Sequence, residues 1–511
     1  MDIFAFVLYF VAMIAIGIYF FFKSKEVTEK DYFLGGRAMG PWVTAMSAQA
    51  SDMSAWLLMG LPGSVLAFGF GQAWIGIGLA IGTAANWILV AKRLRKFSRA
   101  AGDSITLPQY LSNRFASKSH LLSVICAIVF LVCFTIYVAS AFVAGSDVFT
   151  TLVPELPRST AMIIFAAIVV VYTFLGGFNA VCWTDFFQGL LMIAALLIVP
   201  IVVGFTRELE PAALTTVYTG PNGEEFEFVA NFFNASWKDI ISGLGWGLGY
   251  FGMPHIIVRF MAIEKPSMVK KSATVAIIWV VLSLAATIMI AYLGRMFVYS
   301  NGTDLSKVLL AQGKQSLIFV ELARDVFPAF IAGILLAAII AASMSTADSQ
   351  LLVAASSFAS DLYKPMIRKN ASNKEMLWVS RIIVMVIAVV AFFIASSKGK
   401  AAQAIMDLVS NAWGIFGAAF GPAVLLSLFW KRFTYKGAVA GIIAGALIDM
   451  LWLWLPVSDG AALTAVTGIY EIIPGFILGG IVAIVVTLID KAPSKEVEEI
   501  YTRAIDNSID D

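Results

Sequence analysis

Apolar stretches of about twenty residues, separated by short polar segments, recur along the whole chain. Each stretch is long enough to cross a hydrocarbon core about 30 Å thick as an α-helix. They predict thirteen membrane spans, near residues 3–22, 40–66, 71–91, 121–148, 159–178, 182–205, 240–262, 272–296, 327–357, 376–397, 405–430, 437–455 and 470–489. No positively charged segment or small-residue cleavage site precedes the first span, so we expect it to be retained. The expected fold class is an all-α integral membrane protein.

Two of these spans are interrupted where a plain helix should not be. Ser47–Gly63 (SAQASDMSAWLLMGLPG) is polar in its first half, and Ser242–Pro254 holds five glycines and a closing proline. Spans two and seven each open a set of five, and the two sets have opposite orientations because five is odd. Paired interruptions at corresponding positions of inverted halves indicate a transporter site at the midplane of the membrane. Close helix contacts through glycine are the alternative explanation.

An aspartate lies near the middle of the first interrupted stretch. Asp52 is surrounded by Ser47, Gln49, Ser51 and Ser54. An ionised carboxylate at that depth costs at least ~3 kcal/mol, so it normally faces a protein interior, an aqueous cavity or a bound cation. Asp52 therefore indicates a cation pathway, and a hydrogen bond between helices by a protonated acid is the alternative.

Span nine carries a polar face late in its length. Its members, at helical spacing, are Ala342, Ser345, Thr346 and Ser349. Hydroxyl and carbonyl oxygens on one face suit a small hard cation, although such hydroxyls also bond to carbonyls one turn earlier. Further polar groups within spans are Asp348, Asp185 and Tyr137.

Composition and charge agree with a membrane setting and exclude several classes of function. Hydrophobic residues make up 60% of the 511 residues and charged residues 13%, and mean hydropathy is +0.87. Lys and Arg gather after spans one, three, seven, nine and eleven, which predicts an outer N-terminus and a cytoplasmic C-terminus. Three cysteines and two histidines predict neither a disulfide framework nor a metal cluster. We find no nucleophile and base pair, so an enzyme is not expected.

The span pattern predicts a division of the chain into segments. These are an extra helix and inner loop (1–39), a first repeat (40–205), an outer loop (206–239), a second repeat (240–430), two further helices (431–490) and a cytoplasmic tail (491–511). The tail is short and charged, and we expect it to be solvated.

Several motifs together resemble the sodium/solute symporter family. They are LGGR (34–37), SAQASDMSAWLLMGLPG, GWGLGYFGMPHIIVRFMA (245–262), AGILLAAIIAASMST (332–346) and YEIIPGF (470–476). The similarity runs from span one to about Pro493. It implies a LeuT-type five-plus-five inverted repeat, with one extra helix before the core and two after it. It also implies function in the bilayer without nucleic acid or an obligate protein partner.

The resemblance also implies roles for individual residues. The sodium site would consist of the carbonyls of Ala50, Met53 and Ala342 and the hydroxyls of Ser345 and Thr346. Coupling or gating would involve Arg37, Asp52 and Ser54. The substrate pocket would be shaped by Tyr137, Trp246, Tyr250 and Pro254. A second cation position would involve Asp185, Asp348 and Ser349, unless the two carboxylates share a proton.

The activity that the resemblance implies is sodium-coupled uptake of L-proline across the cell membrane by alternating access. The alternative is a symporter of the same family for pantothenate or another amino acid. One departure is Met253, where a proline carrier of the family has glutamine. A receptor domain would need a long cytoplasmic extension, and a channel is disfavoured by the two interrupted helices.

Overall fold

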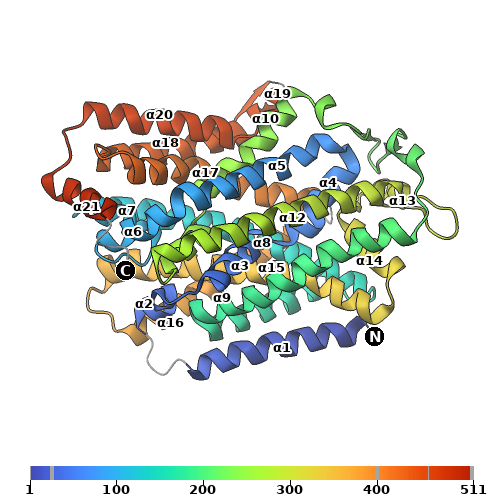
Figure 1. Ribbon diagram of the computed structural model, residues 1–511, viewed down its shortest axis with the longest axis horizontal. Helices are drawn as coiled ribbons and strands as arrows, with labels where there is room; N and C mark the ends of the chain where they lie inside the picture. Colours follow the sequence, from blue (N-terminus) through green and yellow to red (C-terminus); the bar gives the residue numbers. More distant parts are fainter. Residues whose placement is uncertain (1, 24–27, 398–401, 459, 507–511) are drawn as a thin grey trace.

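The chain folds almost entirely into helices, seen in a computed structural model (Figure 1). The structure describes residues 2–23, 28–397, 402–458 and 460–506. The helices of the first half are α1 (Asp2–Lys23), α2 (Glu29–Leu34), α3 (Pro41–Asp52), α4 (Leu61–Phe68), α5 (Phe70–Ala85), α6 (Lys92–Ala100), α7 (Leu107–Arg114), α8 (Leu121–Leu152), α9 (Arg158–Thr206) and α10 (Trp237–Gly245). Those of the second half are α11 (Pro254–Ala262), α12 (Val269–Met296), α13 (Leu305–Ala311), α14 (Ile318–Val326), α15 (Ala329–Ser357), α16 (Asn373–Ser397), α17 (Ala402–Phe429), α18 (Tyr435–Trp454), α19 (Leu463–Thr467), α20 (Ile472–Ile489) and α21 (Lys495–Ile505).

The structure confirms a largely helical chain with many apolar helices but not the predicted number of thirteen spans. Nine helices of the described chain are long and apolar enough to cross a bilayer, and three shorter apolar helices are 3–19, 56–68 and 158–174. Predicted spans five and six form the single element α9, which turns at Gly177, where φ is 62°. Only glycine adopts that backbone conformation without strain, so the two spans lie on either side of this residue.

The long helices run side by side along the horizontal axis of Figure 1. Helices α3, α8, α9, α12 and α15 pack against one another in the core. On one flank α1 packs against α9 and α15, and on the other α18 and α20 pack together and against α17. The helices predicted to lie outside the repeats therefore cover the core from two sides.

Two features differ from the sequence-based expectation. The basic residues predicted to follow span three lie within α6, because a π-helical segment at 86–91 continues α5 into it. The predicted solvated tail instead forms the amphipathic helix α21, which packs on α6. The rings of Tyr501 and Phe97 lie 5.2 Å apart, and Arg114 Nη1 donates to the Val497 carbonyl at 3.3 Å. Apolar residues of one helix face, spread among the charges of the tail, account for this docking.

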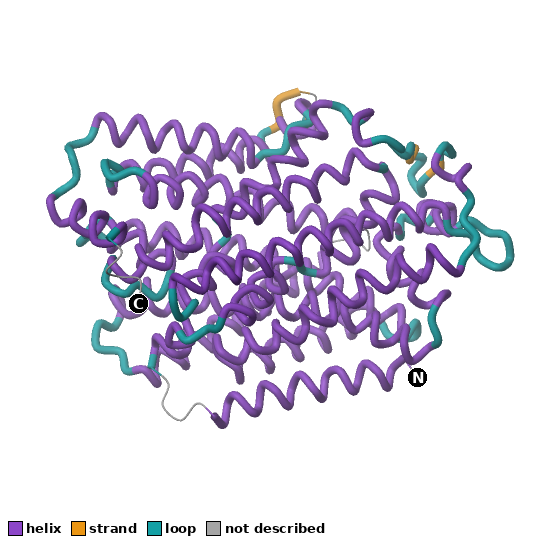
Figure 2. Tube along the Cα trace, viewed as in Figure 1, coloured by secondary structure: helices purple, strands orange, loops and turns teal. Residues whose placement is uncertain are grey.

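Strands occur only as two short hairpins within the described residues (Figure 2). β1 (Tyr218–Thr219) pairs with β2 (Glu225–Phe226), and β3 (Pro456–Ser458) pairs with β4 (Ala461–Ala462), both antiparallel. The first hairpin belongs to the predicted outer loop and lies near the end of α4, where Gly69 and Val229 form a bridge. The boundaries of the repeats and of the other predicted segments stay a prediction.

Candidate functional site: two broken helices around an aromatic cavity

The second span breaks directly after Asp52. Helix α3 ends there, and Met53 leaves the helix with φ −88° and ψ 77°. The Ser54 hydroxyl accepts a hydrogen bond from the Trp56 amide at 3.2 Å, which holds the turn before the chain resumes as a π-helical segment and α4. The last carbonyls of a helix have no partner in the next turn. The break ends the regular helical hydrogen bonding of α3, and the Ala50 carbonyl accepts a bond from the Ser345 hydroxyl instead.

The seventh span breaks between α10 and α11. A 3₁₀ segment at 246–251 joins them, and Met253 is extended directly before Pro254, the first residue of α11. Proline favours an extended residue before it and has no amide hydrogen to donate. The glycines permit close packing, since a Cβ on Gly249 would lie 2.0 Å from the Trp413 indole nitrogen and one on Gly247 2.3 Å from the Gly78 carbonyl.

Both breaks face one narrow cavity. Its lining residues are Asp52, Met53, Trp56, Leu79, Tyr137, Trp246, Tyr250, Val409 and Trp413. The Tyr250 hydroxyl donates to Asp52 Oδ2 at 2.5 Å, joining the two broken spans. Trp246 is stacked between Trp56, at 5.4 Å, and Tyr470, at 5.1 Å. Apolar and aromatic walls with a few polar groups are typical of a small-molecule site, but at about 20 Å³ this cavity is too small for a ligand in the present conformation.

The structure brings together three of the five predicted sodium ligands. The Ser345 hydroxyl lies 2.8 Å from the Ala50 carbonyl oxygen and 3.2 Å from that of Ala342. The Thr346 hydroxyl is buried and has no hydrogen-bond partner among the described residues. Met53 lies at the break, and its sulfur accepts a bond from Ser283 on α12. Neutral oxygens from α3 and α15 thus meet at one buried point, which suits a sodium ion.

The predicted second cation position contains a guanidinium that the sequence analysis did not single out. Arg259 of α11 is 1% exposed and lies 3.0 Å from Asp185 Oδ2 through Nη2. The same nitrogen donates to Ser349 Oγ at 2.5 Å, and Nε donates to Ser47 Oγ at 2.9 Å. The Ser349 hydroxyl also donates to Asp348 Oδ1 at 3.3 Å. The three predicted ligands are therefore neighbours, and two of them already bind a built-in cation.

Arg37 lies away from the cavity, at one end of the bundle. Its Nε forms an ion pair of 2.9 Å with Asp103, and its Nη1 donates to the Met261 carbonyl at 2.5 Å. Burial lowers the pKa of Arg37, although Asp103 acts to raise it. Burial acts to raise the pKa of Asp103 too, but Lys30 and Arg37 outweigh this and hold it below its ordinary value. Arg37 thus ties the turn before α3 to the end of α11.

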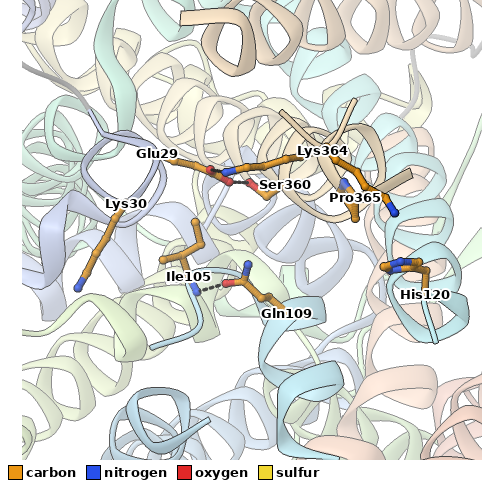
Figure 3. Close-up of a pocket in the computed structure, with 9 residues that line it drawn as sticks. Glu29, Lys30, Ile105, Gln109, His120, Ser360, Lys364 and Pro365 are labelled. Carbon is orange, nitrogen blue, oxygen red and sulfur yellow. Dashed lines mark hydrogen bonds and ion pairs between the residues drawn. The ribbon is translucent and has the colours of Figure 1, made fainter. Parts of the chain in front are cut away.

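A second cavity lies at the same end of the bundle, between α2, α7 and the π-helical extension 358–367 of α15 (Figure 3). Glu29 forms an ion pair with Lys364 and accepts a hydrogen bond from Ser360 at 2.6 Å. These contacts join α2 to the extension of α15.

Sequence reasoning missed Trp56, Trp413 and Arg259. Trp56 and Arg259 lie inside motifs that the analysis quoted, whereas Trp413 has no local signal. Pro254 was predicted to shape the pocket but is not among its lining residues. Met253, the departure from the family pattern, is fully buried and also lies outside the lining.

Two broken helices that line one cavity are the arrangement of a secondary transporter of the LeuT type. The model of the sodium:solute symporter family matches residues 32–445, so the chain belongs to that family. The chain is 43% identical to the sodium/proline symporter of Escherichia coli (strain K12), over 98% of this chain and 95% of the relative. It is 42% identical to the high-affinity proline transporter PutP of Bacillus subtilis (strain 168), over 96% and 98%.

Solved structures with the same fold are much more distant in sequence. A sodium-coupled sialic acid symporter in a substrate-bound outward-open state superposes with a TM-score of 0.72 at 18% identity, over 96% of this chain and 98% of the other. A nucleobase-cation-symport-1 family transporter in a closed conformation superposes with a TM-score of 0.54 at 13% identity, over 92% and 98%. These similarities confirm the fold class that the resemblance implied.

Proposed function

We propose that this protein couples the entry of sodium to the uptake of L-proline by alternating access. The observation that carries the proposal is the contact of the Ser345 hydroxyl with the α3 carbonyl of Ala50, directly beside an aromatic cavity. The names of the relatives, at about 40% identity over nearly the whole chain, support sodium and proline as the coupled pair.

In this mechanism sodium binds first and bridges α3 and α15. The ion holds the α3 break in one conformation, so the cavity next to it is pre-organised and binds substrate more tightly. The aromatic rings would cover the pyrrolidine, and amides released at the breaks would bind the carboxylate. Asp52 does not need to touch the ion, because its bond from Tyr250 couples the two broken spans.

We propose an outer N-terminus and a cytoplasmic C-terminus in the plasma membrane. Helix α21, the last helix of the described chain, lies at the same end of the bundle as α2, α6 and α7, and α1 begins at the other end (Figure 1). The basic segments after α1 and within α6 belong to the end of the bundle that holds α2, α7 and α21. The positive-inside rule places this end in the cytoplasm. The Arg37 and Glu29 ion pairs would then close the inner side.

The candidate second cation position stays a prediction. Asp185 and Asp348 carry two negative charges when ionised, and Arg259 supplies one positive charge. Asp185 Oδ1 and Asp348 Oδ2 have no hydrogen-bond partner in the described part of the chain. One proton or one further cation would balance the remaining charge.

The test is uptake of radiolabelled proline into proteoliposomes under an imposed sodium gradient. A charge moved across ~100 mV supplies about 2.3 kcal/mol and a tenfold gradient ~1.4 kcal/mol, so one ion supports several hundredfold accumulation. Because proline is a zwitterion, uptake should carry current. If no sodium-driven proline uptake is found while radiolabelled pantothenate accumulates under the same gradient, the alternative substrate is favoured.

A further inference from the structure

Two acidic side chains of the C-terminal helices are buried together. Asp449 of α18 is fully buried, and Glu471, the residue before α20, is 2% exposed. A Cβ on Gly414 of α17 would lie 3.0 Å from Asp449 Oδ2 and 3.4 Å from Glu471 Cγ. Both side chains therefore approach the same point of α17.

Neither acid has a cationic partner within the described ranges. The side-chain ion pairs there do not include them. Neither Asp449 oxygen has a hydrogen-bond partner among those residues, and Glu471 accepts one long bond, from Thr464 at 3.4 Å. Two ionised carboxylates are unfavourable in such a place, so the pair requires a positive charge from another source.

The elements around the pair offer little positive charge. The titratable groups nearest to it are Asp407 of α17, Cys133 of α8, Tyr470, and Lys238 and Asp239 of α10. Lys238 lies along Gly468, where an added Cβ would be 3.2 Å from its Cδ. The other groups are acidic or neutral, so they supply no positive charge to the pair.

The pair can be reached from a cavity that adjoins the substrate cavity. Glu471 lines this outer cavity together with Asp239, Asp407 and Trp246, and Trp246 also lines the substrate cavity. Tyr470, next to Glu471 in the chain, stacks on Trp246 at 5.1 Å and donates to the Ser410 carbonyl at 2.8 Å. The aromatic contact that separates the two cavities is thus one residue from the acid pair.

We propose that Asp449 and Glu471 form a proton-binding site, filled from the outer cavity, whose loading stabilises Tyr470 over Trp246. The proton resides on one of the two carboxyl groups, so that the buried pair carries at most one negative charge. A metal cation fits less well, because it needs several oxygen ligands. Gly414 and Gly475 pack directly on Asp449, where a Cβ on Gly475 would lie 3.1 Å from the Asp449 Cβ.

The experiment compares the wild type with Asp449→Asn, Glu471→Gln and the control Asp239→Asn, which removes an acid from the same outer cavity. The apparent proline affinity is measured in proteoliposomes from about pH 5 to pH 9, the range in which buried carboxyl groups titrate. We expect the apparent proline affinity to change about three- to tenfold over this pH range in the wild type and in Asp239→Asn. The profile should be nearly flat in Asp449→Asn and Glu471→Gln. A flat wild-type profile, or two acid variants that follow the wild type, would overturn the proposal.

The uptake measurement rests on the proposed function. A second readout does not depend on it. The thermal midpoint of the purified protein without substrate should depend on pH in the wild type and much less in Glu471→Gln. If proline is not transported but this difference is present, the proton site stands and the substrate is wrong. If Glu471→Gln changes the sodium dependence of the midpoint but not its pH dependence, the site holds a metal ion and the proton assignment is wrong.

Discussion

Two oxygen-rich clusters lie one turn apart on α15 and differ in where their positive charge comes from. Around Ser345 the oxygens are neutral, two carbonyls and two hydroxyls, and no protein cation contacts them among the described residues. Around Ser349 the oxygens belong mostly to carboxylates, and Arg259 lies among them. Under our proposal that sodium binds at the neutral cluster, strong negative charge does not by itself mark the ion site. A site that must release its ion is better built from neutral oxygens, because a buried ion pair resists separation.

The largest expected effect comes from removing the built-in cation. Arg259→Met leaves the Asp185 carboxylate buried and unpaired, which should cost about 3–5 kcal/mol of unfolding free energy. Denaturant unfolding of the purified protein measures the loss. The control Arg207→Met breaks a pair with Asp325 that is about a third exposed and should cost under about 1 kcal/mol. Equal losses in both variants would show that the Arg259 cluster is not the structural pair we describe.

Removing the neutral oxygens should affect sodium rather than folding. Ser345→Ala with Thr346→Ala deletes the two hydroxyls that we propose as sodium ligands. We expect a loss of about 2–3 kcal/mol, or roughly 30- to 150-fold in apparent sodium affinity. The sodium dependence of proline uptake measures it. The matched control is Ser343→Ala, a buried hydroxyl of the same helix that bonds to the Ile339 carbonyl. An equal change in the control would contradict the assignment.

The link between the broken spans should have an intermediate effect. Tyr250→Phe removes the hydrogen bond to Asp52 and should weaken apparent proline affinity about tenfold, from a loss of about 1–2 kcal/mol. Concentration dependence of uptake measures it. Tyr299→Phe, which removes a tyrosine bond to Glu321 outside the cavity, should leave uptake unchanged. If Tyr250→Phe behaves like this control, Asp52 and Tyr250 do not couple the two spans.

The smallest effect is expected at the end of the bundle, at Asp103. Its pKa in the folded state is below its unfolded value, so its ion pairs stabilise the protein above about pH 4 and are lost as pH falls through the folded pKa. Asp103→Asn should lower stability by under about 1 kcal/mol near neutral pH, since the side chain is 43% exposed. The difference from the wild type should vanish in strong acid, as followed by thermal unfolding against pH. A difference that persists there would mean that the ion pairs are not its cause.

Local patterns predicted most of the fold, because each span can be recognised from the hydropathy of its own residues. The break of span seven was predictable as well, since its glycines and Pro254 act on their own backbone. The break of span two, at Met53, follows a polar stretch without Gly or Pro. The docking of α21 and the continuation of α5 into α6 were not predictable in this way. A charged segment with one apolar face is expected to be solvated unless the helix that covers this face is known. For the site, the spacing of Ser345 and Thr346 predicted an oxygen-bearing face on α15, and the structure places Ser345 against the Ala50 carbonyl.

The remaining site residues depend on contacts between distant parts of the chain. Arg259 meets Ser349 across 90 positions, and Trp413 reaches the Trp246 carbonyl across 167. Periodicity within one helix carries no information about which partner a side chain will meet. A charged residue inside a span is a signal that could have drawn attention to Arg259, whereas an aromatic residue in an apolar span, such as Trp413, is not distinctive.

The central claim is that sodium binds to the neutral oxygens and not among the carboxylates. Binding of radioactive sodium to the purified protein without substrate tests it most directly, in the wild type, in Ser345→Ala with Thr346→Ala, and in Asp348→Asn. We predict that binding is lost in the hydroxyl variant and retained in Asp348→Asn. Retention in the hydroxyl variant together with loss in Asp348→Asn would contradict the account.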